Sequence, residues 1–264
     1  MLLVVTGRLL ISMPAVGQAG RIQAAFLEQA ADLQASGDYP GAERLLRDAL
    51  QRLDQSREAH PQLPAVLNNL ASLSQEIGRA SDAERYYRRA IRIYEETEGP
   101  GHPVLIKPLC NLASLYIEEG LPGKAERFYR RALQLAPPGP TDDDDPAIPW
   151  HGLGMALHAQ GKLAEAENCY LEAIVLRRSQ KCRPVELAQT LGNLAVLYLS
   201  TDRFSDALRT QLLVLQSLEE RLAPGHPELA RPLANLGAIY AKTNRLSEAE
   251  EVLRVGITID PEAT

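Results

Sequence analysis

Four asparagines recur inside short, nearly identical phrases of this sequence. The phrases are LNNLASLSQEIG (67–78), LCNLASLYIEEG (109–120), LGNLAVLYLSTD (191–202) and LANLGAIYAKTN (233–244). Their shared asparagines are Asn69, Asn111, Asn193 and Asn235. A carboxamide offers a hydrogen-bond donor and an acceptor at once, so such a side chain can hold the backbone of an extended peptide without reading its side chains.

A cysteine and a histidine suggest a second kind of chemistry. Cys110 and His151 take the same place in the recurring pattern, and together they could form a nucleophile with its base. Neighbouring helices pack ~8–10 Å apart, however, and no orienting carboxylate or oxyanion hole accompanies the two residues. The other histidines precede prolines and lie one or more repeats apart: His60, His102 and His226. We therefore expect no catalytic residue, no metal site and no cofactor.

The phrases belong to a repeat of about 41 residues. A small residue stands at Ala42, Ala83, Ala125, Ala166, Ala207 and Ala249. Seven positions later a second column reads Ala49, Ala90, Ala132, Ala173, Val214 and Gly256. Because six units agree at two independent columns, we divide the chain from residue 20 to 264 into repeats at about 24–60, 61–102, 103–145, 146–183, 184–226 and 227–264.

Each repeat is predicted to be two helices joined by a tight turn. Leu67, Leu70, Ala71 and Ser74 have the i, i+3, i+4, i+7 spacing of one helix stripe. The second helix carries a small residue, an aromatic residue and another small residue, which lets two helix backbones approach closely. The turn falls on residues that tolerate a left-handed backbone, namely Gly37, Gly78, Gly120, Gly161, Asp202 and Asn244. The fold class is therefore all-α.

These features resemble the tetratricopeptide repeat, whose frame is W-x₂-L-G-x₂-Y … A-x₃-F … P. WHGLG (150–154), Ala166 and Tyr170 follow that frame, which places Trp150 in the packed core. LNNLA, AERYYRRAIRIYEE, GHP and the longer period are similar to the kinesin-light-chain subfamily. The resemblance covers about residues 24–261 and implies an α-solenoid, a right-handed superhelix of six helix pairs stabilised by stacking between neighbours.

The resemblance also implies a role for the asparagine column. In this family the first helix of each pair lines the concave side of the superhelix, so the column would face a groove. Lys107 and Arg231 lie on the same face and would add charged donors for carboxylates or phosphates, and Asn68 is assigned to the groove beside Asn69. The competing interpretation is an asparagine ladder that only bridges neighbouring helices.

A groove of this kind implies a non-enzymatic protein–protein interaction scaffold that binds an extended segment of a partner protein. The alternative is a regulatory or sensor array that controls a separately encoded enzyme or response regulator. A third interpretation, a small phosphatase acting on a response regulator, needs acid and amide groups outside the repeat frame. No insertion in the sequence supplies them.

Composition excludes several partner classes. The net charge of −6 gives no basic field that would hold nucleic acid. Arginine and tyrosine interleave in AERYYRRAIRIY and AERFYRRALQL, but the tyrosines fall on packing positions and the arginines have acidic neighbours, so we expect solvated outer faces. No later segment has the roughly 18 consecutive apolar residues of a membrane span. Three irregularly spaced cysteines, Cys110, Cys169 and Cys182, favour neither disulfides nor zinc.

The first nineteen residues differ in kind from the rest. They are mainly apolar, contain Pro14, and place Gly17 and Ala19 as a signal peptidase requires, although Arg8 interrupts the apolar run. Residues 1–19 are therefore predicted to be a signal peptide. Its removal would leave an exported protein, periplasmic or secreted; a cytoplasmic location is the alternative.

Two further segments depart from the repeat. The tract APPGPTDDDDPAIPW (136–150) is predicted to be a flexible acidic loop in which Asp142–Asp145 repel one another and stay solvated. It lacks the ligand alternation and glycine of a calcium loop. The last repeat has no capping helix after it, so Leu253 and Ile257 are expected to stay exposed and to favour end-to-end self-association.

Overall fold

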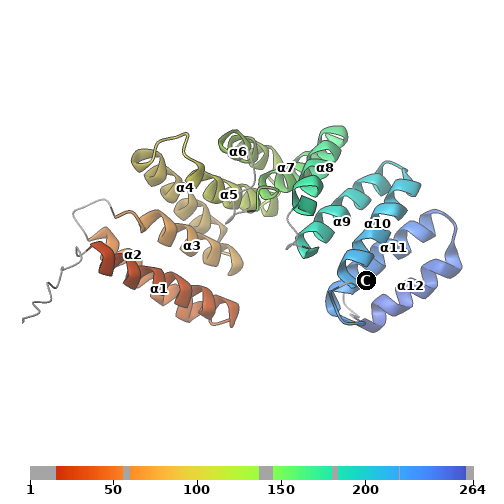
Figure 1. Ribbon diagram of the computed structural model, residues 1–264, viewed down its shortest axis with the longest axis horizontal. Coiled ribbons are helices and arrows are strands. Elements are labelled where there is room, and N and C mark those ends of the chain that lie inside the picture. Colours follow the sequence, from red (N-terminus) through yellow and green to blue (C-terminus); the bar gives the residue numbers. More distant parts are fainter. Residues whose placement is uncertain (1–15, 56–59, 137–144, 180–183, 220, 260–264) are drawn as a thin grey trace, which may run out of the picture. The chain divides into compact units, whose positions relative to one another are not determined.

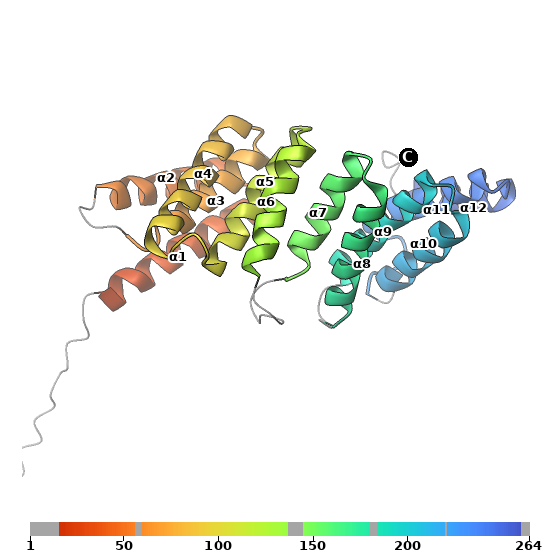
Figure 2. The same ribbon diagram turned by 90° about the horizontal axis from the view of Figure 1, so that it is seen from above.

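Helices account for all of the regular structure in the computed structural model, which describes residues 16–55, 60–136, 145–179, 184–219 and 221–259. Within these ranges there is no β-strand, and helices follow one another in antiparallel pairs (Figures 1 and 2). The predicted all-α fold of helix-pair repeats is confirmed. Residues 1–15, which hold most of the predicted signal peptide, lie outside the described residues, so that assignment stays a prediction.

The chain divides into two compact units, residues 1–97 and 98–264. The first unit contains α1 (Val16–Ala35), α2 (Tyr39–Asp54), α3 (Leu63–Glu76) and α4 (Ala80–Thr97). The second begins with a short 3₁₀ helix η1 (Pro103–Leu105), α5 (Ile106–Glu118), α6 (Pro122–Leu135), α7 (Ile148–Ala159) and α8 (Leu163–Ser179). It continues with α9 (Pro184–Ser200), α10 (Phe204–Glu219), η2 (Pro227–Leu229), α11 (Ala230–Lys242) and α12 (Leu246–Ile259).

The turn inside each pair uses a left-handed residue, as the sequence predicts. The φ angles are positive at Gly37, Gly78, Gly120, Gly161, Asp202 and Asn244. At Gly161 the next residue, Lys162, donates its backbone N–H to the carbonyl of Leu157, and Arg203 donates to Tyr198 in the same way. This six-to-one bond is the Schellman closure, which satisfies a carbonyl that the ending helix leaves unpaired. Asp and Asn replace glycine in the last two repeats because they tolerate this backbone better than other residues.

Small residues bring the two helices of a pair together. The first column, from Ala42 to Ala249, is buried in every repeat, and Ala90, Ala132 and Ala173 of the second column are fully buried. Leucines and tyrosines fill the space around them, and Tyr87 and Tyr170 are each only 1% exposed. Trp150 is partly buried rather than enclosed, so the tyrosines, and not this tryptophan, carry the aromatic part of the core.

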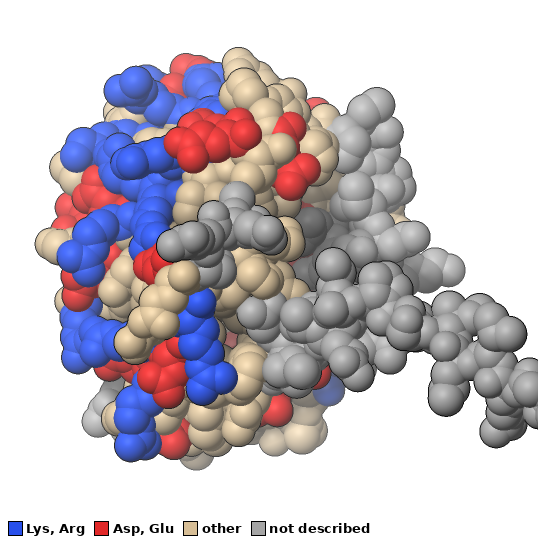
Figure 3. Space-filling view, turned by 90° about the vertical axis from the view of Figure 1, so that its left-hand side faces the viewer, with Lys and Arg blue, Asp and Glu red and all other residues tan. Residues whose placement is uncertain are grey.

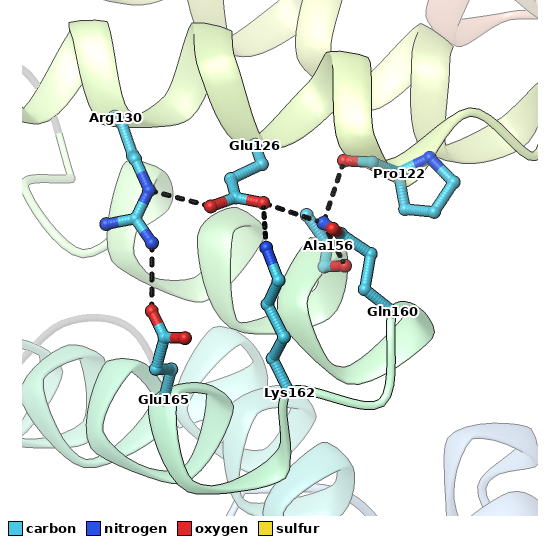
Figure 4. A network of polar contacts seen from close by, with 7 residues as sticks. All are labelled: Pro122, Glu126, Arg130, Ala156, Gln160, Lys162 and Glu165. Carbon is cyan, nitrogen blue, oxygen red and sulfur yellow. Dashed lines mark hydrogen bonds and ion pairs between the residues drawn. The ribbon is translucent and has the colours of Figure 1, made fainter.

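A recurring ion pair connects successive repeats. Its acid follows the first small column and its base follows the next left-handed turn, 36 residues later: Glu43 with Arg79, Glu126 with Lys162, and Glu167 with Arg203. Figure 4 shows the pair at Glu126, whose carboxylate also accepts hydrogen bonds from Arg130 and Gln160. The hydrogen bond from Lys162 is the main cause that lowers the Glu126 pKa to about 2. These ion pairs hold neighbouring repeats in register.

The arginine-rich helices have the solvated outer faces that the sequence predicts. Tyr87 of α4 and Tyr129 of α6 are buried, whereas Arg88 and Arg130 are exposed and pair with glutamates one turn earlier. On the face drawn in Figure 3, Lys and Arg side chains gather along one side with Asp and Glu side chains between them. Charges of both signs therefore share this surface.

The last described helix leaves part of its apolar surface exposed. Ile257 is 49% exposed, as expected, but Leu253 is partly buried because its side chain packs against Gly237 of α11. Self-association through this end stays a prediction. None of the described helices is both long enough and apolar enough to cross a membrane.

Candidate functional site

The asparagine column lies on the first helix of each pair. Asn69 is on α3, Asn111 on α5, Asn193 on α9 and Asn235 on α11, and each side chain is partly exposed. Asn68 is different, because it is 6% exposed and lies in the packed interior of α3, where it offers little surface to a partner. The asparagines at partly exposed positions are the ones that can reach a ligand while their helix stays packed.

Gly152 stands at the asparagine-column position of the fourth repeat and leaves room there for an aromatic ring of the preceding repeat. A Cβ atom at this position of α7 would lie 2.2 Å from Cζ of Tyr129, whose ring comes from α6 of the preceding repeat. Since Tyr129 is 5% exposed, moving its ring aside would disturb the packing around it. The column is therefore interrupted where an aromatic side chain of the neighbouring repeat occupies its space.

Two of the asparagines line a pocket within the second unit. The pocket has a volume of about 450 Å³ and lies among α7, α9, α10 and α11. Asn193, Asn235 and Arg231 contribute to its lining, as do Val196, Val214 and Leu218. The pocket therefore combines amide groups and a guanidinium with apolar walls, and it brings together three of the residues predicted from the sequence.

The other predicted residues lie elsewhere. Lys107 and Asn111 are one turn apart on α5, with Lys107 exposed and Asn111 partly buried. Asn68 and Asn69 belong to the first unit. Of the residues predicted to line a groove, Asn193, Arg231 and Asn235 are thus the ones that share this pocket.

An ion pair is buried next to this pocket. Arg177 of α8 donates from Nε to Oδ2 of Asp145 over 3.0 Å, and the two side chains are 4% and 1% exposed. The second carboxylate oxygen accepts the backbone N–H of Ala147 at the start of α7. The expectation that Asp145 stays solvated is therefore wrong: Arg177, which is distant in sequence, compensates its charge. Asp142, Asp143 and Asp144 lie outside the described residues.

The same arginine reaches the pocket through a threonine. Arg177 donates from Nη1 to the hydroxyl of Thr190 on α9 and to the backbone carbonyl of Glu186 over 2.6 Å. His151, on α7 and in the pocket lining, has its Nδ1 3.1 Å from the same hydroxyl. Burial, helped by the charge of Arg177 and opposed by that of Asp145, lowers the pKa of His151 to about 4.

His151 predicts a pH dependence of stability. Its ordinary pKa is 6.5, so as the pH falls the unfolded chain binds the proton before the folded chain does. The stability is complete above about pH 6.5 and falls toward about pH 4, by a total of roughly 3 kcal/mol. Urea unfolding at about pH 7 and about pH 5 should show a smaller loss for His151→Asn than for the wild type. Equal losses in the two proteins would contradict this assignment.

The structure gives no support to a Cys110–His151 dyad. Cys110 is 4% exposed in the packed interior of α5, and it contributes to the raised pKa of the neighbouring Tyr129. Nδ1 of His151 is engaged with Thr190, and its ring lies near Tyr170, with 6.1 Å between ring centroids. Among the described residues there is also no group of three or more His, Cys, Asp or Glu side chains that could hold a metal ion.

Several polar residues of the pocket were not assigned to it from the sequence, among them His151, Gln189 and Gln211. Gln189 and His151 are on the first helices, and Gln211 is on the second helix α10. Gln211 could have been found, because it stands four residues after Ala207, where three other repeats have tyrosine. A polar residue in an aromatic column was the available signal.

Comparisons with known proteins agree with this architecture. A family model described as tetratricopeptide repeat matches residues 21–96, 62–137, 145–215 and 186–262. No curated protein matches the sequence.

Several solved structures are similar to this chain. BtubC (BKLC) from P. vanneervenii is 27% identical, with a TM-score of 0.65 over 89% of this chain and 91% of that one. A putative kinesin light chain with nearly identical TPR-like repeats from Podosopora anserina is 19% identical, with a TM-score of 0.62 over 76% of this chain and 97% of that one. MamA protein is 16% identical, with a TM-score of 0.53 over 77% and 94% of the two chains, respectively. The latter two show the fold alone, and together the matches confirm the resemblance to kinesin-light-chain-like repeats.

Proposed function

We propose that this chain, which belongs to the tetratricopeptide repeat family, is a non-enzymatic scaffold that binds an extended segment of a partner protein. The observation that carries the proposal is the pocket of about 450 Å³ among α7, α9, α10 and α11. It is large enough to hold one or two side chains of a bound segment, and part of its lining comes from the asparagine column.

The lining suits a peptide in two ways. Asn193 and Asn235 come from successive first helices, α9 and α11, so their carboxamides can pair with peptide groups at two points along an extended chain. Val196, Val214 and Leu218 form apolar walls between them, against which a side chain of the segment loses contact with water. Amides hold the backbone and apolar walls hold a side chain.

Charged side chains at the pocket would favour one direction of the bound segment. Arg231 and Glu228 both contribute to the lining, and both are exposed. A guanidinium and a carboxylate three residues apart would favour one direction of a bound segment that carries the opposite pattern of charge.

Removing the polar side chains of the pocket should weaken binding of the partner. A triple variant, Asn193→Ala, Asn235→Ala and Arg231→Ala, is expected to bind a partner at least tenfold more weakly, since several hydrogen bonds of about 0.5–1.5 kcal/mol each are lost. Proteins captured from native cell extract by the wild type are identified first. Synthetic segments of those proteins are then titrated against both variants by calorimetry.

A matched control variant removes the same kinds of side chain from positions outside the pocket. Asn168→Ala, Gln216→Ala and Arg209→Ala remove two amides and one guanidinium from exposed positions of α8 and α10. This control variant should bind like the wild type, and all three proteins should have equal helicity. If the pocket variant keeps its affinity for the segment, or if the control variant loses as much, binding does not take place in this pocket.

A further inference from the structure

One column of the repeat contains an exception in the fifth repeat. Four residues after the first small column, the second helices carry Leu46, Tyr87, Tyr129, Tyr170, Gln211 and Leu253. Gln211 is 0% exposed, so it takes the same enclosed place as the tyrosines. Its Nε2 donates to the backbone carbonyl of Pro232 on α11 over 2.8 Å, and the amide therefore points toward the first helix of the next repeat.

The pocket arises where this glutamine replaces an aromatic ring. Tyr129 places its ring against Gly152, the asparagine-column position of the following repeat, whereas Tyr87 and Tyr170 are followed by asparagine at this position. The corresponding position after Gln211 is Asn235, and both Gln211 and Asn235 line the pocket. A glutamine is slimmer than a tyrosine and lacks the ring, so the space that Tyr129 fills in one repeat is open in the other.

Gln211 also holds a polar atom without a partner. Its Oε1 is buried and accepts no hydrogen bond from the described residues. A buried acceptor left unpaired destabilises a fold, and such groups are rare in native proteins outside functional sites. Nε2 stays bonded to Pro232, so a ligand donor that reaches Oε1 from the pocket would complete the hydrogen bonding of this amide.

His151 supplies a second acceptor to the same pocket. The Thr190 hydroxyl donates to the carbonyl of Glu186 over 3.0 Å and accepts from Arg177. In the tautomer that donates Nδ1–H to this hydroxyl, Nε2 of His151 is an acceptor. Burial and Arg177 keep the ring neutral near pH 7. The other charged and titratable groups around the ring are Asp145 and Tyr170.

We propose that Gln211 is the specificity-determining residue of this site: it opens the pocket and, with His151, selects a partner side chain that ends in a neutral N–H or O–H donor. A carboxylate is disfavoured there because it would meet the lone pairs of Oε1 of Gln211 and of Nε2 of His151. The rim charges of Glu228 and Arg231 are opposite in sign, so they add no preference for a cation. This inference rests on the proposed function, since it describes what the peptide pocket reads.

Two variants distinguish the effect of the open pocket volume from the effect of the acceptor Oε1 of Gln211. Gln211→Leu introduces a side chain that two other repeats have at this position, which keeps the pocket open but removes Oε1. Gln211→Tyr restores the aromatic ring and fills the pocket. Each should change the Tm by less than about 2 °C, because the loss of the hydrogen bond to Pro232 offsets the removal of a buried unpaired acceptor and the gain in apolar burial. A Tm lower by more than about 5 °C for Gln211→Leu would contradict the view that this residue is kept for binding and not for packing.

Selection from a random-peptide phage library then tests which ligand side chains the pocket prefers. The wild type should enrich peptides that share one position occupied by Asn, Gln, Ser, Thr, Tyr or Trp, and Gln211→Tyr should lose those peptides. Gln211→Leu should bind the same peptides about tenfold more weakly and enrich apolar residues at the shared position.

Other outcomes overturn the proposal at different levels. If Gln211→Leu enriches the same donor residues as the wild type, Gln211 does not select the ligand, although the groove still binds peptides. Enrichment of Asp or Glu at the shared position by the wild type would show that Arg231, and not the acceptors, reads the side chain. If the folded wild type enriches no peptide, both this inference and the proposed function fail.

Discussion

Replacing Arg177 with methionine is expected to lower the free energy of unfolding by about 3–5 kcal/mol. Methionine fills a similar volume but leaves the carboxylate of Asp145 buried, at 1% side-chain exposure, without its positive partner. The change also removes the hydrogen bonds to Thr190 and to the Glu186 carbonyl, which tie α8 to α9. Urea unfolding followed by circular dichroism measures the loss.

The single tryptophan of the chain makes the measurement local. Trp150 lies on α7, which begins next to Asp145, so its fluorescence reports whether α7 separates from α8 before the rest of the chain unfolds. In a repeat fold each repeat is stabilised mainly by its neighbours, so this early local transition is the expected behaviour.

An exposed ion pair provides the control for Arg177. Arg254 pairs with Glu250 on α12, where the two side chains are 76% and 74% exposed, and Arg254→Met should change stability by less than about 0.5 kcal/mol. Adding Asp145→Asn to Arg177→Met should recover part of the loss, since no unpaired charge then remains buried. Equal effects of the two arginine variants would mean that the Asp145–Arg177 pair is not enclosed.

Replacing Gly152 with alanine is expected to cost about 1–3 kcal/mol, although alanine is the better helix former. The new methyl group would meet Cζ of Tyr129 at 2.2 Å, and this ring is buried. Either α6 and α7 move apart or the ring leaves its rotamer, and both disturb the contact between the third and fourth repeats. Thermal unfolding of the two proteins measures the difference.

Gly192→Ala is the matched control for Gly152→Ala. Gly192 is also in the interior of a first helix, α9, but a Cβ there would meet nothing within 4 Å. This change should raise stability by about 0.5–1 kcal/mol, through the lower backbone entropy of the unfolded chain. Adding Tyr129→Leu to Gly152→Ala should restore part of the loss, because the contact with the ring is gone. If both glycine variants gain stability, Tyr129 is not what excludes asparagine from the fourth repeat.

The sequence by itself determined the repeat and its local geometry. The period, the small columns and the left-handed turns at Gly161, Asp202 and Asn244 were all predictable, because they depend on backbone preference and on contacts that recur in every repeat. The asparagine column was predictable for the same reason. Its placement on the first helices follows from spacing alone.

Only the tertiary structure decided which positions come together. In the sequence, Asp145 belongs to an acidic run that is expected to be solvated. In the structure it pairs with Arg177, which lies 32 residues later. In the sequence, Gln211 is one polar residue of an amphipathic helix. The structure shows that it is buried, that its oxygen is unpaired and that it lines the pocket together with Asn235. These features are departures from the repeat, and their consequences depend on side chains that meet across different helices. A repeat pattern specifies what every unit shares, whereas a binding pocket forms where one unit differs.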